Sequence, residues 1–127
     1  MSDVCDASFA QGAALVAGGS GGIGAEICLA LAKEGANVVL TYRSNEAQAL
    51  SVVEQIQALG RKALAVQVDL TDSQSVKDAV AKALTQFSSL NSVVYAAGPN
   101  LHMSFISELS PEEWMRVIQA DLGGSFN

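Results

Sequence analysis

The residues best placed to do chemistry are five glycines between positions 16 and 24, in the stretch VAGGSGGIG. Residues 19–24 fit the pattern G-x-G-x-x-G, and they lie between an apolar run and a helical pattern. Unpaired N–H groups at a helix N-terminus favour an anion, and glycines let a phosphate approach the backbone. A P-loop is excluded because no Gly-Lys-Ser/Thr follows. The stretch predicts a turn that binds a dinucleotide pyrophosphate, with a β–α turn that binds no ligand as the alternative.

The end of the next apolar run indicates which dinucleotide is bound. An NAD site normally has Asp or Glu about 20 residues after the glycines, where it holds the ribose hydroxyls. Residues 41–45 read Thr-Tyr-Arg-Ser-Asn instead, and the missing acid also argues against a methyltransferase. A guanidinium can bind the 2′-phosphate of NADP(H) through two N–H groups at once, so Arg43 predicts NADP(H). Ser44 and Asn45 are expected to donate further hydrogen bonds to this phosphate. On the same grounds Thr41→Asp is expected to favour NADH. A solvated arginine at a helix start is the alternative for Arg43.

Apolar runs and helical patterns alternate along the whole chain, which predicts parallel strands joined by right-handed crossovers. The predicted fold is α/β: a Rossmann-type doubly wound parallel sheet in three α/β/α layers, incomplete at about four strands, within one domain, 1–127. The predicted strands are 13–18, 37–42, 62–70 and 91–98. The predicted helices are 22–35, one that opens at 43–48 and stops at 60, 71–87, and one that starts at 110.

Helical spacing predicts which residues face the core. The predicted apolar faces are Ile23, Ile27, Leu29 and Leu31 in the first helix, Val52, Val53, Ile56 and Leu59 in the second, and Val76, Val80 and Leu84 in the third. The last helix has Ser110 as its predicted N-cap, Pro111 at its first position and Glu113 completing a capping box. The fourth strand is expected to form an exposed apolar edge.

Composition excludes several classes of function. The net charge is −6 and the seven basic residues are scattered, which argues against a nucleic-acid partner. No stretch approaches the roughly 20 apolar residues of a membrane span, and the N-terminus lacks the features of a signal peptide. We therefore expect a cytoplasmic protein with no membrane partner. Cys5 and Cys28 form no CxxC and lie near no histidine, so no metal is expected, and Cys28 is predicted to be a small buried residue.

Residues 17–24 also resemble the Thr-Gly-x-x-x-Gly-Ile-Gly signature of the short-chain dehydrogenase/reductase family, with alanine in place of threonine. Three more segments stand in the family's order: VDLTD (68–72) at the end of the third strand, YAAG (95–98) at the Asn-Asn-Ala-Gly motif, and ADLGGSFN (120–127) at the Asn-Leu-x-Gly segment. The resemblance covers about residues 10–127 and is strongest to 3-oxoacyl carrier-protein reductases.

The resemblance implies a set of cofactor-binding residues. Those for the pyrophosphate and ribose are Gly18, Ser20, Gly22, Ile23 and Gly24. Asp69 is implied to bind the adenine, Leu70 is a further implied cofactor-binding residue, and Ala97 and Gly98 are implied to lie beneath the nicotinamide ribose. For Asp69 the alternative is a polar strand end next to a helix cap.

The family's catalysis depends on a Tyr-x-x-x-Lys pair with an upstream serine, and this chain lacks the pair. Its two tyrosines, Tyr42 and Tyr95, are followed four residues later by Glu46 and Pro99. In the family the pair lies past residue 127, so the chain resembles a cofactor-binding half. Asp121 stands where the family has a catalytic asparagine that orders a water through its backbone carbonyl. The resemblance therefore implies a catalytic role for Asp121.

Taken together, the resemblance implies an NADPH-dependent oxidoreductase that reduces a small-molecule carbonyl by hydride transfer. The carbonyl substrates include a 3-oxoacyl group bound to a carrier protein. The partner is a further copy in a homo-oligomer, or the missing half of the enzyme. The alternative is a non-catalytic nucleotide-binding or assembly module, since the Tyr/Lys pair is absent.

Overall fold

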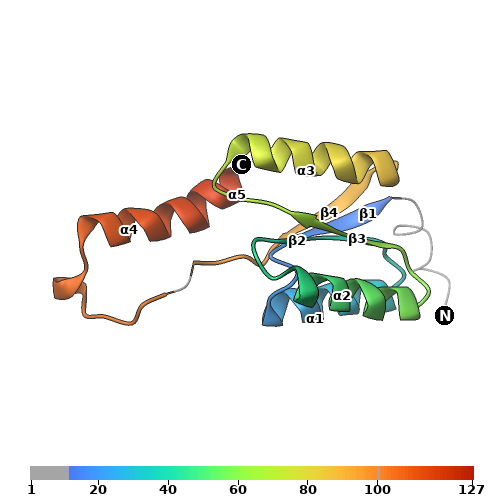
Figure 1. The fold of residues 1–127 in the computed structure, drawn as a ribbon, viewed down its shortest axis with the longest axis horizontal. Helices are drawn as coiled ribbons and strands as arrows, with labels where there is room; N and C mark the ends of the chain where they lie inside the picture. The colour runs from blue at the N-terminus through green and yellow to red at the C-terminus, as the bar shows by residue number, and fades with distance from the viewer. Residues whose placement is uncertain (1–11, 100) are drawn as a thin grey trace.

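The computed structural model describes residues 12–99 and 101–127. Its centre is a four-stranded parallel sheet in the order β3-β2-β1-β4. Helices α1 and α2 cover one face of this sheet and α3 covers the other, which makes three layers (Figure 1). The predicted Rossmann-type α/β architecture is confirmed. The predictions made for Cys5 and for the N-terminal segment lie outside the described residues.

The elements follow the predicted order, and some end earlier than expected. The strands are β1 (Ala13–Ala17), β2 (Val38–Tyr42), β3 (Ala63–Gln67) and β4 (Leu90–Tyr95). The longer helices are α1 (Gly22–Lys33), α2 (Glu46–Ala58), α3 (Ser73–Gln86) and α4 (Pro111–Ile118). A 3-10 turn, η1 (Ile106–Glu108), precedes α4, and a π-helical turn, η2 (Gln119–Gly123), joins α4 to the short α5 (Gly124–Phe126). The predicted ends of the third and fourth strands, residues 68–70 and 96–98, lie beyond the observed strands and line a cleft.

Separate apolar clusters cover the two faces of the sheet, because successive side chains of a strand point to opposite faces. Val38 and Leu40 of β2 pack in the cluster that includes residues of α1 and α2, whereas Val39 between them packs in the cluster that includes residues of α3. All three side chains are buried. The central strands are therefore packed from both sides, and this packing holds the carboxyl ends of the strands in place.

Helices α1 and α3 face the sheet mainly through small side chains, whereas α2 buries Val52 and Ile56, as predicted. α1 buries Cys28 and Ala32, and the prediction that Ile23 belongs to the buried face is wrong, because this side chain is 77% exposed at the start of the helix. Leu59 and Leu84 were predicted to face the core and are also exposed. Small residues four positions apart let a helix approach the sheet closely and leave larger neighbours at its flanks. The burial predicted for Cys28 is confirmed, and it raises the pKa of the thiol to about 12.

The fourth long helix, α4, begins as the sequence predicts. Ser110 is its N-cap and accepts a hydrogen bond from the Glu113 N–H at 3.1 Å, and Pro111 is the first helical residue. The second half of the predicted capping box is wrong, because the Glu113 carboxylate accepts from Arg116 Nη2 at 2.7 Å and from Nε at 3.0 Å. A guanidinium offers a carboxylate stronger, charge-assisted hydrogen bonds than a backbone N–H does. Beyond this start, α4 lies to one side of the sheet rather than over it (Figure 1).

One outer edge of the sheet is β4, as predicted, and its Val93 side chain is 69% exposed. A strand whose outer edge has no partner, with apolar surface beside it, favours association with another chain. We expect residues 1–127, expressed alone, to self-associate, and Val93→Lys to shift the population toward monomer, because lysine near a strand edge opposes pairing. Sedimentation velocity over a range of concentrations measures this. A strictly monomeric unsubstituted chain would contradict the expectation.

Candidate functional site

A cleft of about 690 Å³ lies at the carboxyl edge of the sheet, where the ends of all four strands meet α4 and η2. It brings together many of the residues that the sequence indicates. Those that line it are Gly18, Ser20, Arg43, Ser44, Asp69, Leu70, Ala97 and Gly98. Five others are not among its lining residues: Gly22, Ile23, Gly24, Asn45 and Asp121. The first three of these form the start of α1, directly after the lining loop.

The glycine-rich loop is held by hydrogen bonds to the neighbouring strand and within itself. Gly18 has a φ of +76°, a conformation that only glycine adopts readily, and its N–H donates to Thr41 Oγ1 at 3.0 Å. The Gly21 N–H donates to the Gly18 carbonyl at 3.2 Å. Thr41 is buried, so the expectation that Thr41→Asp would change cofactor preference is revised. An aspartate there would bury a charge beneath the loop, and we expect it to disturb the loop instead.

Some glycines of the loop are packed too tightly for a side chain, whereas another faces open space. A Cβ on Gly18 would lie 2.7 Å from the Ala97 backbone, one on Gly19 would lie 2.6 Å from Leu40 Cβ, and one on Gly24 would overlap the Gly18 backbone. These glycines are therefore required by the packing of the protein. A Cβ on Gly22 would meet nothing within 4 Å. The space in front of Gly22 is open, as close approach of a ligand to the backbone requires.

The N-terminus of α1 is prepared for an anion. Its N-cap is Gly21, which supplies no side-chain hydrogen bond, and its first turn has no acidic residue. The first N–H groups of a helix have no partner within the helix, and a negative charge placed there is stabilised by the helix dipole. Backbone N–H groups beside an open glycine surface make a site for a phosphate.

The different surroundings of Gly24 and Gly22 lead to a stability prediction. Gly24→Ala is expected to lower the free energy of unfolding by about 1–3 kcal/mol, because the added methyl group overlaps backbone that cannot move freely. Gly22→Ala, the matched control, is expected to change it by less than about 0.5 kcal/mol, because the methyl group enters open space. Urea unfolding of both variants measures the difference. Equal losses would contradict the steric distinction.

The loop after β2 places a cation on the rim of the cleft. Arg43 is exposed there, and its backbone carbonyl accepts a hydrogen bond from Gln67 Nε2 at 2.9 Å, which ties the loop to β3. Ser44 lines the cleft beside it. Asn45 has a structural role, since its Oδ1 accepts from the Gln48 N–H at 3.1 Å and caps α2. Arg43 and Ser44, rather than Asn45, are thus the polar residues of this loop that line the cleft.

Asp69 lies just past β3, the strand paired with β2, and its carboxylate is near enough to Arg43 to feel its charge. Its Oδ1 accepts hydrogen bonds from the Thr71 N–H at 3.0 Å and from the Thr71 hydroxyl at 2.6 Å, and its own N–H donates to Ser75 Oγ at 3.0 Å. The bonds from Thr71, with a smaller contribution from the charge of Arg43, hold the pKa of Asp69 below its usual value. The carboxylate is therefore charged at neutral pH. It both organises the turn before α3 and lines the cleft.

The far wall of the cleft comes from the end of β4 and from the helical segment after it. Tyr95 Oη donates to the Ala120 carbonyl at 2.8 Å, and both residues line the cleft. The Asp121 carboxylate lies close by, with Oδ1 3.9 Å from the point where a Cβ on Gly98 would stand. Burial first, and the charge of Asp121 second, raise the pKa of Tyr95. Asp121 thus lies next to the lining residue Gly98 without lining the cleft itself.

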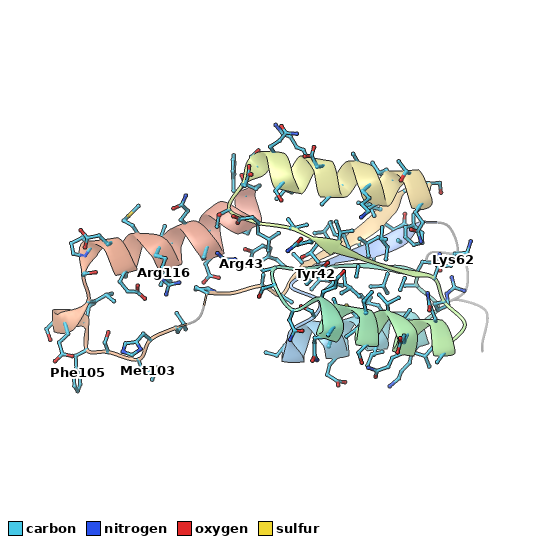
Figure 2. The ribbon with its side chains drawn as sticks, viewed as in Figure 1. Tyr42, Arg43, Lys62, Met103, Phe105 and Arg116 are labelled. Carbon is cyan, nitrogen blue, oxygen red and sulfur yellow. The ribbon has the colours of Figure 1, made fainter. Side chains whose placement is uncertain are left out.

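Sequence reasoning missed several lining residues. They include Tyr42, Thr71, Tyr95, Arg116, Gln119 and Ala120. Thr71 was visible within VDLTD as a hydrogen-bonding neighbour of the aspartate. Arg116 gave no signal, because its place beside the cleft depends on the course of the long segment between β4 and α4. Figure 2 shows Arg43 and Arg116 toward the same end of the sheet, with Lys62 at the opposite end.

Two other kinds of feature were sought in the described part of the chain. No helix within residues 12–99 and 101–127 has both the length and the apolar character to cross a membrane. Over the same residues, no group of three or more His, Cys, Asp or Glu side chains could hold a metal ion.

The fold and the cleft define a class: an α/β protein with a glycine-rich, nucleotide-binding turn at the carboxyl edge of a parallel sheet. Comparison with known families places the chain within that class. The family described as short chain dehydrogenase matches residues 12–127. The chain belongs to this family.

Individual relatives agree with this placement. The chain is 39% identical over 114 residues to the 3-oxoacyl-[acyl-carrier-protein] reductase FabG of Staphylococcus aureus, an alignment that covers 90% of this chain and 46% of the relative. A solved short chain dehydrogenase from Burkholderia cenocepacia in complex with NADP has a TM-score of 0.83 at 33% identity, covering 93% of this chain and 48% of that one. A short-chain dehydrogenase/reductase from Serratia marcescens has a TM-score of 0.84 at 34% identity, covering 93% and 48%. The chain spans less than half the length of these relatives.

Proposed function

We propose that this chain binds NADP(H) in the cleft and contributes the cofactor-binding half, residues 1–127, of an oxidoreductase. The observation that carries the proposal is the open surface at Gly22 beside the uncapped, acid-free N-terminus of α1. A Cβ on Gly22 would meet no protein atom within 4 Å, and the N–H groups of a helix N-terminus favour a phosphate. The complex of the Burkholderia cenocepacia relative with NADP supports the choice of ligand.

Each part of the cofactor has residues of matching chemistry. The pyrophosphate would be held by the first N–H groups of α1, at Gly22 to Gly24, with Ser20 at the side of the loop and Ile23 next to the ribose. Arg43 and Ser44 would hold the 2′-phosphate, because they line the rim and no acid at the end of β2 opposes them. The remaining members of the site are Asp69 and Leu70 for the adenine and Ala97 and Gly98 for the nicotinamide end.

We propose that the reaction is reduction of a carbonyl group. When bound, NADPH supplies the hydride. The name of the Staphylococcus aureus relative supports a 3-oxoacyl group on a carrier protein as the substrate. Asp121 is the proposed catalytic position of this half, since its backbone carbonyl stands where the family has a carbonyl that orders a water. The protein would act in the cytoplasm as a homo-oligomer, or together with the half that contains the proton donor.

A second candidate function is a nucleotide-binding or assembly module without catalysis. One observation favours it: neither Tyr42 nor Tyr95 is followed by a lysine four residues later. The two candidates share the cofactor and differ in turnover. Binding therefore tests what they have in common, and turnover separates them.

The binding test is titration of the native protein with NADPH and with NADH by isothermal calorimetry. We expect both to bind, and NADPH to bind more tightly, because Arg43 adds a charge-assisted contact to the 2′-phosphate. Loss of NADPH absorbance on addition of 3-oxoacyl thioesters, measured with the half that supplies the proton donor present, then distinguishes the enzyme from the module. Tighter binding of NADH, or no binding of either cofactor, would overturn the proposed function.

A further inference from the structure

The helical segment after β4 contains a carbonyl that the helix itself leaves without its usual partner. In an α-helix the Gly124 N–H would donate to the Ala120 carbonyl, four residues back. In the π-helical turn η2 this N–H is directed to the carbonyls of Gln119 and Asp121 instead. The Ala120 carbonyl is thereby skipped. Tyr95 Oη, from the end of β4, donates to it at 2.8 Å and takes the place of the missing N–H.

The space around this hydrogen bond is shaped for the tyrosine. Gly124 is buried, and a Cβ on it would overlap the Tyr95 hydroxyl. Any other residue at position 124 would therefore push the phenol away from the Ala120 carbonyl. A second bond ties the same end of the helix to the sheet, since Asn127 Nδ2 donates to the Leu70 carbonyl at 2.9 Å. The π turn is thus fitted to the sheet at the place where it borders the cleft.

We propose that Tyr95 is a positioning residue: its hydrogen bond to Ala120 holds the π turn and so fixes the cleft wall formed by Gln119 and Ala120, with Asp121 beside Gly98. Without the Tyr95 hydrogen bond, we expect the π turn to relax toward an α-helical turn, in which the Gly124 N–H would donate to the Ala120 carbonyl. A π-helical turn within an α-helix frequently accompanies a functional site. The inference rests on the proposed function in one respect, namely that this wall faces the nicotinamide end of NADPH.

Tyr95 holds this position as a neutral hydrogen-bond donor. Burial and the nearby charge of Asp121 both raise the pKa of its hydroxyl, so the proton stays on the oxygen at neutral pH. That proton points to a backbone carbonyl in the described geometry. Tyr95 therefore acts on the cleft through the helix, and it is not a substitute for the missing proton donor.

The test is Tyr95→Phe in the native protein, which removes one hydroxyl. NMR of the backbone reports the π turn directly: we expect the Ala120 carbonyl carbon and the Gly124 amide to change their shifts as the Gly124 N–H moves to Ala120. NADPH binding is expected to weaken about threefold to tenfold, the equivalent of one net hydrogen bond. Binding of adenosine 2′,5′-bisphosphate, which lacks the nicotinamide end, is expected to stay unchanged.

Ser125→Ala is the matched control. It removes a hydroxyl that donates to the Leu122 carbonyl at 2.9 Å in the same turn of helix, away from the lining residues. It should leave the Ala120 and Gly124 shifts and both affinities unchanged. Gly124→Ala is the second test: it displaces the hydroxyl while keeping Tyr95, and it should reproduce the loss for NADPH.

Several results would overturn the inference. One is equal weakening of NADPH and adenosine 2′,5′-bisphosphate by Tyr95→Phe, which would mean a general packing role. Another is an unchanged Ala120 carbonyl shift. If the shift moves as expected but the unsubstituted protein binds neither ligand, the hold of Tyr95 on the π turn stands and the proposed function fails. The two ideas therefore fail separately.

Discussion

Replacing Arg43 with alanine is expected to weaken NADPH binding by about 10- to 150-fold and to leave NADH binding nearly unchanged. A hydrogen bond to a charged group contributes about 1.5–3 kcal/mol, which corresponds to this range of affinity. Arg43 lines the cleft at the end of β2, where an acid would bind the ribose hydroxyls of NAD. Dissociation constants for both cofactors, measured by calorimetry on the Arg43→Ala protein, check the expectation.

Two controls make the result specific to the position. Lys62→Ala removes the same charge at the opposite end of the sheet and should change neither affinity by more than about twofold (Figure 2). Arg43→Lys keeps the positive charge but loses the paired N–H donors with which a guanidinium binds phosphate. Its NADPH affinity should therefore fall between those of the unsubstituted and alanine proteins. Arg116 is the other arginine that lines the cleft, and its guanidinium binds Glu113 on the α4 side. Equal losses for NADPH and NADH in Arg43→Ala would mean that Arg43 only stacks on the adenine.

The order of the helices and strands and the position of the glycine-rich loop could be predicted from the sequence. Strict alternation of apolar runs with helical patterns allows few arrangements, because parallel strands need crossovers and these are right-handed. The loop could be predicted because glycines between a strand and a helix have a direct mechanical meaning. Which glycine serves the packing and which leaves room for a ligand could not be predicted. Gly24 and Gly22 differ only in what surrounds them in three dimensions.

Helix faces were harder to predict than helix positions. Helical spacing identified large apolar residues such as Ile23 and Leu84, while the structure buries Cys28 and Ala83 against the sheet. Periodicity shows that residues share a face, and it does not show how closely that face approaches the sheet. Close approach selects small side chains, and it is set by the sheet and both helix layers together.

The π turn could not be predicted from local pattern at all. The segment around Asp121 has the apolar spacing of a continuous helix, and the sequence identified it through the family resemblance alone. The turn departs from α-helical geometry because Tyr95 offers a hydroxyl to a carbonyl 25 residues away and Gly124 leaves room for it. Such a departure depends on a contact between distant residues, and no window of neighbouring residues contains it.

Residues 1–127 alone are expected to reduce carbonyl substrates about 10²- to 10⁴-fold more slowly than a complete relative such as the Staphylococcus aureus reductase. This factor is what a positioned general acid contributes. Within the part of the chain that the structure describes, the cleft has no lining lysine to lower the pKa of a tyrosine. The two tyrosines that line it have raised pKa values: Tyr42 through burial and Glu46, and Tyr95 through burial and Asp121. Neither is prepared to give up a proton at neutral pH.

The measurement is loss of NADPH absorbance with a 3-oxoacyl thioester, made on a preparation whose NADPH binding has first been confirmed by calorimetry. Binding with turnover slowed by this factor is the expected outcome, because the hydride source would be present and the proton donor would not. Turnover near that of the complete relative would contradict it, and would require a donor within these residues. Asp69 is a poor candidate for that donor, because its hydrogen bonds from Thr71 lower its pKa and keep it charged. In the proposed reaction the proton would therefore come from a residue that does not line this cleft, so cofactor binding and proton donation would be separable.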